Sequence, residues 1–281
     1  HHRSSAASDV YKRQLPSSIF ILPVIAELGL SIVSHGVFSV GPKYGCTHHL
    51  TLKELGYNSN NDHQEIVERL ENKDIGWAYA DQSMFNPKLH NLMSLRKQII
   101  KRPVITTVEV LVKPVSSKND MFFTGFVHKP YPPIYLELSR NAQFNSATVI
   151  RGTEGGIIPS LRQTGKVHFY HSAGEQDDYY DVTPEDLGIV QSSRAVDIPE
   201  EITRKNTKDK IESKVDAVDI AKETIKSGTS ALSGNDGPML SCIQLGAAII
   251  LQRATGNDLG NCSKEVLRVL KSGAALKRMK R

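Results

Sequence analysis

Residues 149–163 read VIRGTEGGIIPSLRQ, an apolar run that leads directly into a glycine-rich turn. Glycine in such a turn lets the backbone approach a ligand closely, so the turn is typical of a phosphate or metal site. Its one acid, Glu154, is followed by Gly155, Gly156, Ile157 and Ile158. Isoleucines therefore stand where a metal-binding turn is expected to carry carboxylates.

The segments on both sides of this turn alternate between strand and helix patterns. Residues 121–128 and 146–150 are rich in aromatic and β-branched side chains and predict two strands, with a helix at 133–141 between them. Another strand is predicted at 166–170, after the turn. This alternation predicts an α/β fold whose mostly parallel sheet is flanked by helices.

A similar unit lies near the start of the chain. A helix is predicted at 19–28 and a short apolar strand at 30–34, which leads into His35 and Gly36. Open α/β sheets bind ligands at the carboxyl ends of their strands, and this glycine turn lies at such an end.

The next region reads as helical. Thr47 and Asp62 are suited to cap helices at 48–55 and 63–71, and Pro87 is suited to begin a helix that runs to about residue 102. We therefore predict a small helical subdomain at 43–106, inserted into an α/β domain of residues 15–42 and 107–281. Further predictions are β structure at 104–112, an acidic stretch at 177–181, a charged linker at 205–210 and helices at 216–227, 237–254 and 263–276.

Length, charge and cysteine content limit the classes of protein to which this chain can belong. The chain has 281 residues and a formal net charge of +5. Residues 1–14 (HHRSSAASDVYKRQ) are polar and aperiodic, and we interpret them as an adapter-derived segment, with the natural chain starting upstream of Leu15. Without their three basic residues and one acid the net charge is +3, too mild to indicate nucleic acid by itself. Three distant cysteines predict free thiols in a cytoplasmic protein, and no apolar run is long enough to span a membrane.

Several short motifs resemble a known family when they are taken in order. After the His35–Gly36 pair come KELG at 53–56 and the following stretches: FNPKLHNLMSLR at 85–96, GFVHKPY at 125–131, VIRGTEGG at 149–156, VTPEDLG at 182–188 and SGAAL at 272–276. Together they resemble the anthranilate phosphoribosyltransferases of glycosyltransferase family 3, and most closely their YbiB-type branch. The resemblance implies a helical domain beside an α/β domain, a ligand cleft between them and a homodimer. It also implies that this chain is N-terminally truncated and lacks the family's glycine-rich phosphate loop.

The resemblance also implies which parts of the active site remain. The enzymes bind phosphoribosyl pyrophosphate and Mg²⁺, and their early strand ends in a lysine followed by HGNR. Here Ser34, Val37 and Phe38 replace the lysine, asparagine and arginine. An aspartate–glutamate pair that holds the metal in the enzymes aligns with Ile157 and Ile158. We therefore predict no metal ligands and no catalytic residues, and only a phosphate-loop remnant made of His35, Gly36, Gly152, Gly155 and Gly156.

Arg96 falls within the apolar stripe of its predicted helix, so it needs a polar partner. The matching arginine of the enzymes contacts the aromatic acid substrate, and a structural ion pair with an acid of a facing element is the alternative. Tyr131 is suited either to stack on a base or to cover the core. The predicted anion-binding set is Arg96, Lys97, Lys101, Arg102, Lys129, Arg151 and Arg162.

Three functions follow as hypotheses. The YbiB-type branch is known for binding single- and double-stranded nucleic acid, so the first is a non-catalytic protein whose basic cleft contacts backbone phosphates, largely independently of sequence. The second is an active phosphoribosyltransferase with an unknown acceptor, which alone requires Mg²⁺ and phosphoribosyl pyrophosphate. The third is a small-molecule sensor that uses the same cleft without turnover.

Overall fold

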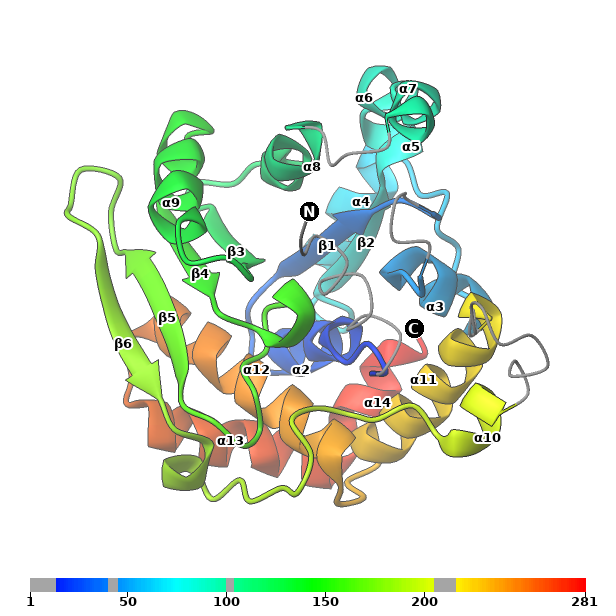
Figure 1. Cartoon of the computed structure of the whole chain (residues 1–281), viewed down its shortest axis with the longest axis vertical. Helices are drawn as coiled ribbons and strands as arrows, with labels where there is room; N and C mark the ends of the chain where they lie inside the picture. Colours follow the sequence, from blue (N-terminus) through cyan, green and yellow to red (C-terminus); the bar gives the residue numbers. More distant parts are fainter. Residues whose placement is uncertain (1–13, 40–44, 100–103, 205–215) are drawn as a thin grey trace, which may run out of the picture.

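The computed structural model describes residues 14–39, 45–99, 104–204 and 216–281 (Figure 1). Two separate sheets lie above a layer of helices in this view. The first pairs β1 (Ile32–Gly36) with β2 (Trp77–Asp81) in parallel, and Ser34 is in register with Tyr79. The second has the order β3 (Met121–Gly125), β4 (Ser146–Ile150), β5 (Gly165–Tyr170) and β6 (Asp178–Val182).

The helices of the first half surround β1 and β2. They are η1 (Ser18–Phe20), α2 (Ile21–Glu27), α3 (His48–Glu54), α4 (His63–Glu71), α5 (Gln82–Phe85), α6 (Pro87–His90), α7 (Met93–Gln98), α8 (Ile105–Val108) and η2 (Glu109–Leu111). Asp62 caps α4 through a reciprocal capping box with Glu65, and Thr47 accepts a hydrogen bond from Leu50 N–H at the start of α3.

Most helices of the second half form the floor below both sheets in Figure 1. The helices of this half are α9 (Tyr131–Asn141), η3 (Thr153–Gly155), η4 (Pro184–Leu187), α10 (Glu200–Arg204), α11 (Ala217–Leu232), α12 (Pro238–Thr255), α13 (Leu259–Ser272) and α14 (Ala274–Met279). The predicted apolar helix at 237–254 is confirmed as α12, which is buried along most of its length. Gly228 of α11 packs against Phe20 so closely that a Cβ there would lie 2.1 Å from the phenyl ring.

The α/β class is confirmed, but several elements differ from the sequence prediction. Residues 105–111 form α8 and η2 in place of the expected β structure. They pair with no described strand, and β-branched residues gain from a strand only by pairing. The strand β2 lies inside the stretch predicted to be helical. Its residues are all buried, so it lacks the alternation that marks a one-sided strand.

Two further differences concern pairing and helix length. The pairings of β4 with β5 and of β5 with β6 are antiparallel, so the larger sheet is mixed. The strand β6 overlaps the acidic stretch at 177–181, for which the sequence predicts no strand. The long helix predicted from Pro87 is divided into α6 and α7. The division into domains at residues 43 and 106 stays a prediction. The segment 1–14, apart from Gln14, and the linker at 205–210 lie outside the described residues.

No helix in the described part of the chain is long and apolar enough to cross a membrane.

Candidate functional site

A cavity of about 570 Å³ lies between the two sheets. Its walls come from the start of η1, the first residue of α3, η2, the segment after β3 and the turn after β4. The carboxyl end of β3 and the turn that follows β4 thus meet at one site, as expected for ligand binding in an α/β fold.

The glycine-rich turn after β4 is closely packed against the end of β3. Thr153 N–H donates to the carbonyl of Ile158 at 2.9 Å, which closes the turn. A Cβ on Gly152 would lie 1.7 Å from the Gly156 carbonyl oxygen, and a Cβ on Gly125 would lie 2.1 Å from the same atom. These glycines are therefore required by the packing of backbone on backbone, whether or not a ligand approaches the turn.

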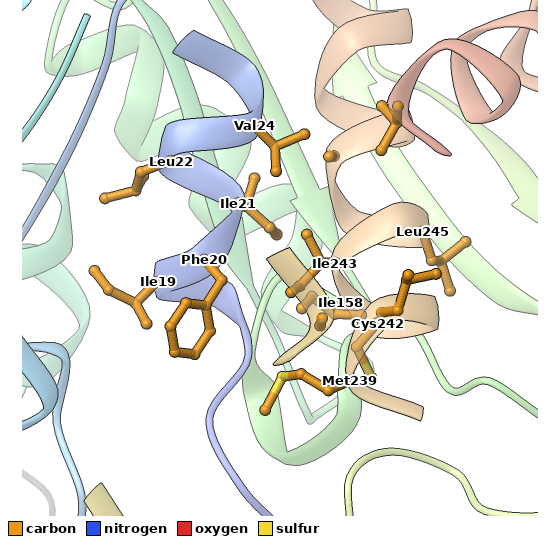
Figure 2. Packing of buried hydrophobic residues seen from close by; sticks show 14 of the residues in the cluster. Ile19, Phe20, Ile21, Leu22, Val24, Ile158, Met239, Cys242, Ile243 and Leu245 are labelled. Carbon is orange, nitrogen blue, oxygen red and sulfur yellow. The ribbon is translucent and has the colours of Figure 1, made fainter. Parts of the chain in front are cut away.

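The isoleucines of the turn have a structural role. Ile158 is only 5% exposed, and Figure 2 shows it beside Ile243, among the side chains of α2 and α12. A Cβ on Gly246 of α12 would lie 2.5 Å from Ile21 and 3.0 Å from Ile158, so the three residues meet at one point. The turn is anchored in the core by an apolar side chain at a position where the resemblance implies a metal ligand.

This chemistry does not suit Mg²⁺. Magnesium requires oxygen ligands, and the side chains of Ile157 and Ile158 provide none. Among the described residues, no group of three or more His, Cys, Asp or Glu side chains could hold a metal ion.

Arg96 lies in the cavity wall and forms the ion pair that was one of its two predicted roles. It is 8% exposed, and one terminal guanidinium nitrogen donates to Glu109 Oε2 of η2 at 2.5 Å. Its Nε is buried and has no hydrogen-bond partner among the described residues. A buried donor without a partner costs free energy, so a ligand oxygen that reached this edge of the guanidinium would relieve that cost.

The other predicted cations whose side chains the structure describes do not join Arg96 at the cavity. Lys129, Arg151 and Arg162 are exposed, and none of them lines it. The side chain of Lys97 and all of Lys101 and Arg102 lie outside the described residues. In the described lining, Arg96 is the single lysine or arginine, and the basic cleft stays a prediction.

Only some residues of the predicted phosphate-loop remnant line the cavity. Gly155 and Gly156 line the cavity, whereas His35, Gly36 and Gly152 do not. His35 Nε2–H donates to the carbonyl of Val110 at 3.2 Å, and burial lowers the pKa of its imidazole. His35 is therefore engaged in holding η2 over β1.

Sequence reasoning missed two histidine–hydroxyl contacts, which involve two residues of the cavity lining, Ser18 and His48. His48 Nε2 lies 2.8 Å from Ser18 Oγ, and its Nδ1 lies 2.8 Å from Ser34 Oγ. Burial, with the nearby His35, lowers the pKa of His48 to about 4, so its imidazole is neutral at pH 7. The three residues belong to α3, η1 and β1 and are far apart in sequence, so no local pattern could have indicated them.

A second histidine is fully enclosed. His49 lies 3.1 Å from Asp81 Oδ2 and 3.1 Å from Ser59 Oγ, and all three side chains are buried away from the cavity lining. Burial acts to raise the pKa of Asp81, but hydrogen bonds from His49 and Ser83 outweigh it and hold the pKa below its usual value.

Comparisons with known proteins agree with this architecture. Among curated proteins, the anthranilate phosphoribosyltransferase of Aquifex aeolicus (strain VF5) is 23% identical over 254 residues, which cover 90% of this chain and 67% of that protein. An uncharacterized protein of the same organism is 30% identical over 146 residues, or 50% of this chain and 41% of the relative. The chain thus spans only part of the length of these relatives.

Solved structures show the same fold. The crystal structure of anthranilate phosphoribosyltransferase from Thermus thermophilus superposes with a TM-score of 0.72 at 18% identity, covering 96% of this chain and 73% of that one. The enzyme from Saccharomyces cerevisiae in complex with PRPP and Mg gives 0.71 at 14% identity, covering 96% and 69%. Since a family model matches residues 17–276, the chain belongs to the glycosyl transferase family, a/b domain.

Proposed function

We propose that this protein is anthranilate phosphoribosyltransferase-like and binds an aromatic carboxylic acid in the cavity between the two sheets. The observation that carries the proposal is Arg96, the single lysine or arginine in the described cavity lining, whose buried Nε has no hydrogen-bond partner among the described residues. A carboxylate is the anion that best fits a guanidinium, because the planar groups share parallel hydrogen bonds.

The remaining lining suits an aromatic ring. Phe126, Tyr131 and Tyr135 are part of the cavity wall, together with hydroxyl groups such as those of Thr107 and Thr124. Small-molecule sites are commonly apolar pockets with a few polar groups that fix orientation. The names of the relatives point to the same ligand class, since one Saccharomyces cerevisiae structure was solved in complex with 4-fluoroanthranilate.

The test is calorimetric titration of the protein with anthranilate. Arg96→Lys keeps the charge but removes the planar fork, and we expect it to weaken binding by about tenfold, or about 1.4 kcal/mol. Arg151→Ala is the matched control, because Arg151 is exposed and lies outside the cavity lining, and it should bind as the wild type does. Absence of binding at millimolar anthranilate would overturn the proposal.

Pentosyl transfer is tested in the same preparation. Phosphoribosyl pyrophosphate and Mg²⁺ are added with anthranilate. Turnover is measured as the decrease in anthranilate fluorescence over time. Because the side chains of Ile157 and Ile158 offer the metal no oxygen, we expect acceptor binding without turnover. Turnover would instead identify an active phosphoribosyltransferase.

Nucleic-acid binding is a second proposal, which rests on a different surface and on the resemblance to the YbiB-type branch. Gly125 and Ile150 are in register at the ends of β3 and β4, so Lys129 and Arg151 both follow strand ends on one sheet edge. Both side chains are exposed and have no ion pair with another described residue. We expect weak binding of a labelled oligonucleotide that falls with salt, and a Lys129→Ala/Arg151→Ala variant with a smaller salt slope. An unchanged slope would exclude this edge as the site.

A further inference from the structure

Ser18, His48 and Ser34 have the spatial relationship of a nucleophile, a base and an orienting group. Ser18 Oγ lies 2.8 Å from His48 Nε2, and the opposite ring nitrogen lies 2.8 Å from Ser34 Oγ. A hydroxyl within hydrogen-bond reach of a histidine, which is itself fixed by a third group, is the arrangement that activates serine for covalent catalysis.

A second serine–histidine arrangement, Ser59 with His49, differs from this one in its access to the cavity. Ser18 and His48 line the cavity, and Ser34 lies behind them on β1. Ser59, His49 and Asp81 have similar spacing, but each is buried and none lines the cavity. The chain therefore contains a reactive-site geometry that a small molecule can reach and an enclosed counterpart that serves as an internal control.

The protonation state of His48 supports a role as base. Burial, with the nearby His35, lowers the pKa of its imidazole to about 4, so the ring is neutral at pH 7. A neutral imidazole has one donor nitrogen and one acceptor nitrogen. If Nδ1–H donates to Ser34 Oγ, the lone pair of Nε2 accepts the Ser18 hydroxyl proton, and the Ser18 oxygen is free to attack.

We propose that Ser18 is a nucleophile toward small, uncharged carboxylic esters that enter the cavity. Ser18 Oγ bonds to the ester carbonyl carbon while its proton moves to His48 Nε2. The bond from that carbon to the alkoxy oxygen breaks, and the leaving alkoxide takes the proton from His48 and departs as an alcohol. Water then gives a proton to His48 Nε2 as its oxygen attacks the acyl group. The acyl bond to Ser18 Oγ breaks, His48 returns the proton to that oxygen, and the carboxylic acid is released.

The lining also accommodates an uncharged substrate of this kind. Most of its described residues carry no charge, and Arg96 and Glu109 are paired with each other. Phe126, Tyr131 and Ile157 supply apolar surface for an aryl or short alkyl group. This activity does not depend on acceptor binding at Arg96 or on pentosyl transfer.

The test is covalent labelling of the whole chain with a short-chain alkyl fluorophosphonate, followed by intact mass measurement and peptide mapping. We expect one adduct, located on Ser18. Ser18→Ala should abolish it, and His48→Gln should slow its formation by about 100-fold or more, because a positioned base contributes at least that factor. Ser59→Ala is the matched control and should label at the wild-type rate. Thermal melting of each variant identifies any that fail to fold.

Each outcome decides the proposal. Labelling of Ser18 that depends on His48, with a burst of nitrophenol from 4-nitrophenyl acetate equal to one equivalent of protein, supports it. No adduct on the folded wild-type protein overturns it, as does an adduct on another serine such as Ser17. Since the wild-type result alone can exclude the nucleophile, the conclusion stands even if His48→Gln does not fold.

Discussion

Replacing Ile158 by aspartate tests whether the turn after β4 is a structural anchor or a ligand loop. Ile158 is 5% exposed and packs beside Ile21 and Gly246 in the main core. Truncation to alanine removes a buried side chain and leaves a cavity, which costs about 3 kcal/mol. Aspartate adds the desolvation of a carboxylate with no cation beside it in the described structure, so the total cost is about 5 kcal/mol.

Ile157 provides the comparison within the same turn. Its side chain is only partly buried, so Ile157→Asp should cost about 1 kcal/mol. Unfolding in urea, followed by circular dichroism, gives the free energy of unfolding for each variant. A loss of about 5 kcal/mol is a large part of the stability of an ordinary domain, so Ile158→Asp should be largely unfolded in buffer.

The reasoning is refuted if Ile158→Asp loses less than about 1 kcal/mol, since a buried carboxylate without a partner costs more than that. Such a result would mean that the turn moves readily and presents position 158 to solvent. In that case the double variant Ile157→Asp/Ile158→Asp becomes a direct means of creating a Mg²⁺ site, which calorimetry with MgCl₂ would detect.

Three further predictions follow from other parts of the structure. Gly125→Ala should lower the free energy of unfolding by about 2 kcal/mol in the same urea assay, because the new Cβ would meet the Gly156 carbonyl. Gly174→Ala is the control: no atom lies within 4 Å of the new Cβ, so the free energy of unfolding should change by less than about 0.5 kcal/mol. The pKa of His48 is lowered to about 4, so labelling of Ser18 should keep its rate from about pH 8 to about pH 5.5, whereas a base of ordinary pKa would lose most of its activity over that interval. The His48 imidazole takes up a proton at a higher pH in the unfolded chain than in the folded chain, so it lowers the free energy of unfolding as the pH falls from about 6.5 toward 4. His48→Gln should reduce this pH-dependent loss, as measured by urea unfolding at several pH values.

The elements that the sequence predicts well are those with local signals. The helix caps at Asp62 and Thr47 and the apolar run of α12 depend on neighbouring residues, and all three are present. The elements that sequence reasoning misses depend on tertiary partners. β2 is hidden because its residues are all buried, and 104–112 form helical turns despite a β-branched composition.

The candidate site shows the same limit. The stripe position of Arg96 predicts that it needs a partner, and Glu109, 13 residues away, provides it. Nothing local indicates that Ser18 and Ser34 reach His48 from 30 and 14 residues away. A site assembled from separate elements becomes visible only when the fold brings those elements together.

The glycines of the turn and its side chains at 157 and 158 answer to separate physical requirements. Gly125 and Gly152 are required because two backbones pass within van der Waals contact of the Gly156 carbonyl, a constraint that belongs to the fold. Metal ligation would be a separate requirement on the side chains at 157 and 158, and isoleucine at both positions leaves that backbone contact undisturbed. Burial of Ile158 against α12 is itself a reason for an apolar residue at that position. A glycine pattern therefore indicates the fold of this turn, whereas the chemistry of the cavity has to be deduced from Arg96, Ser18 and His48.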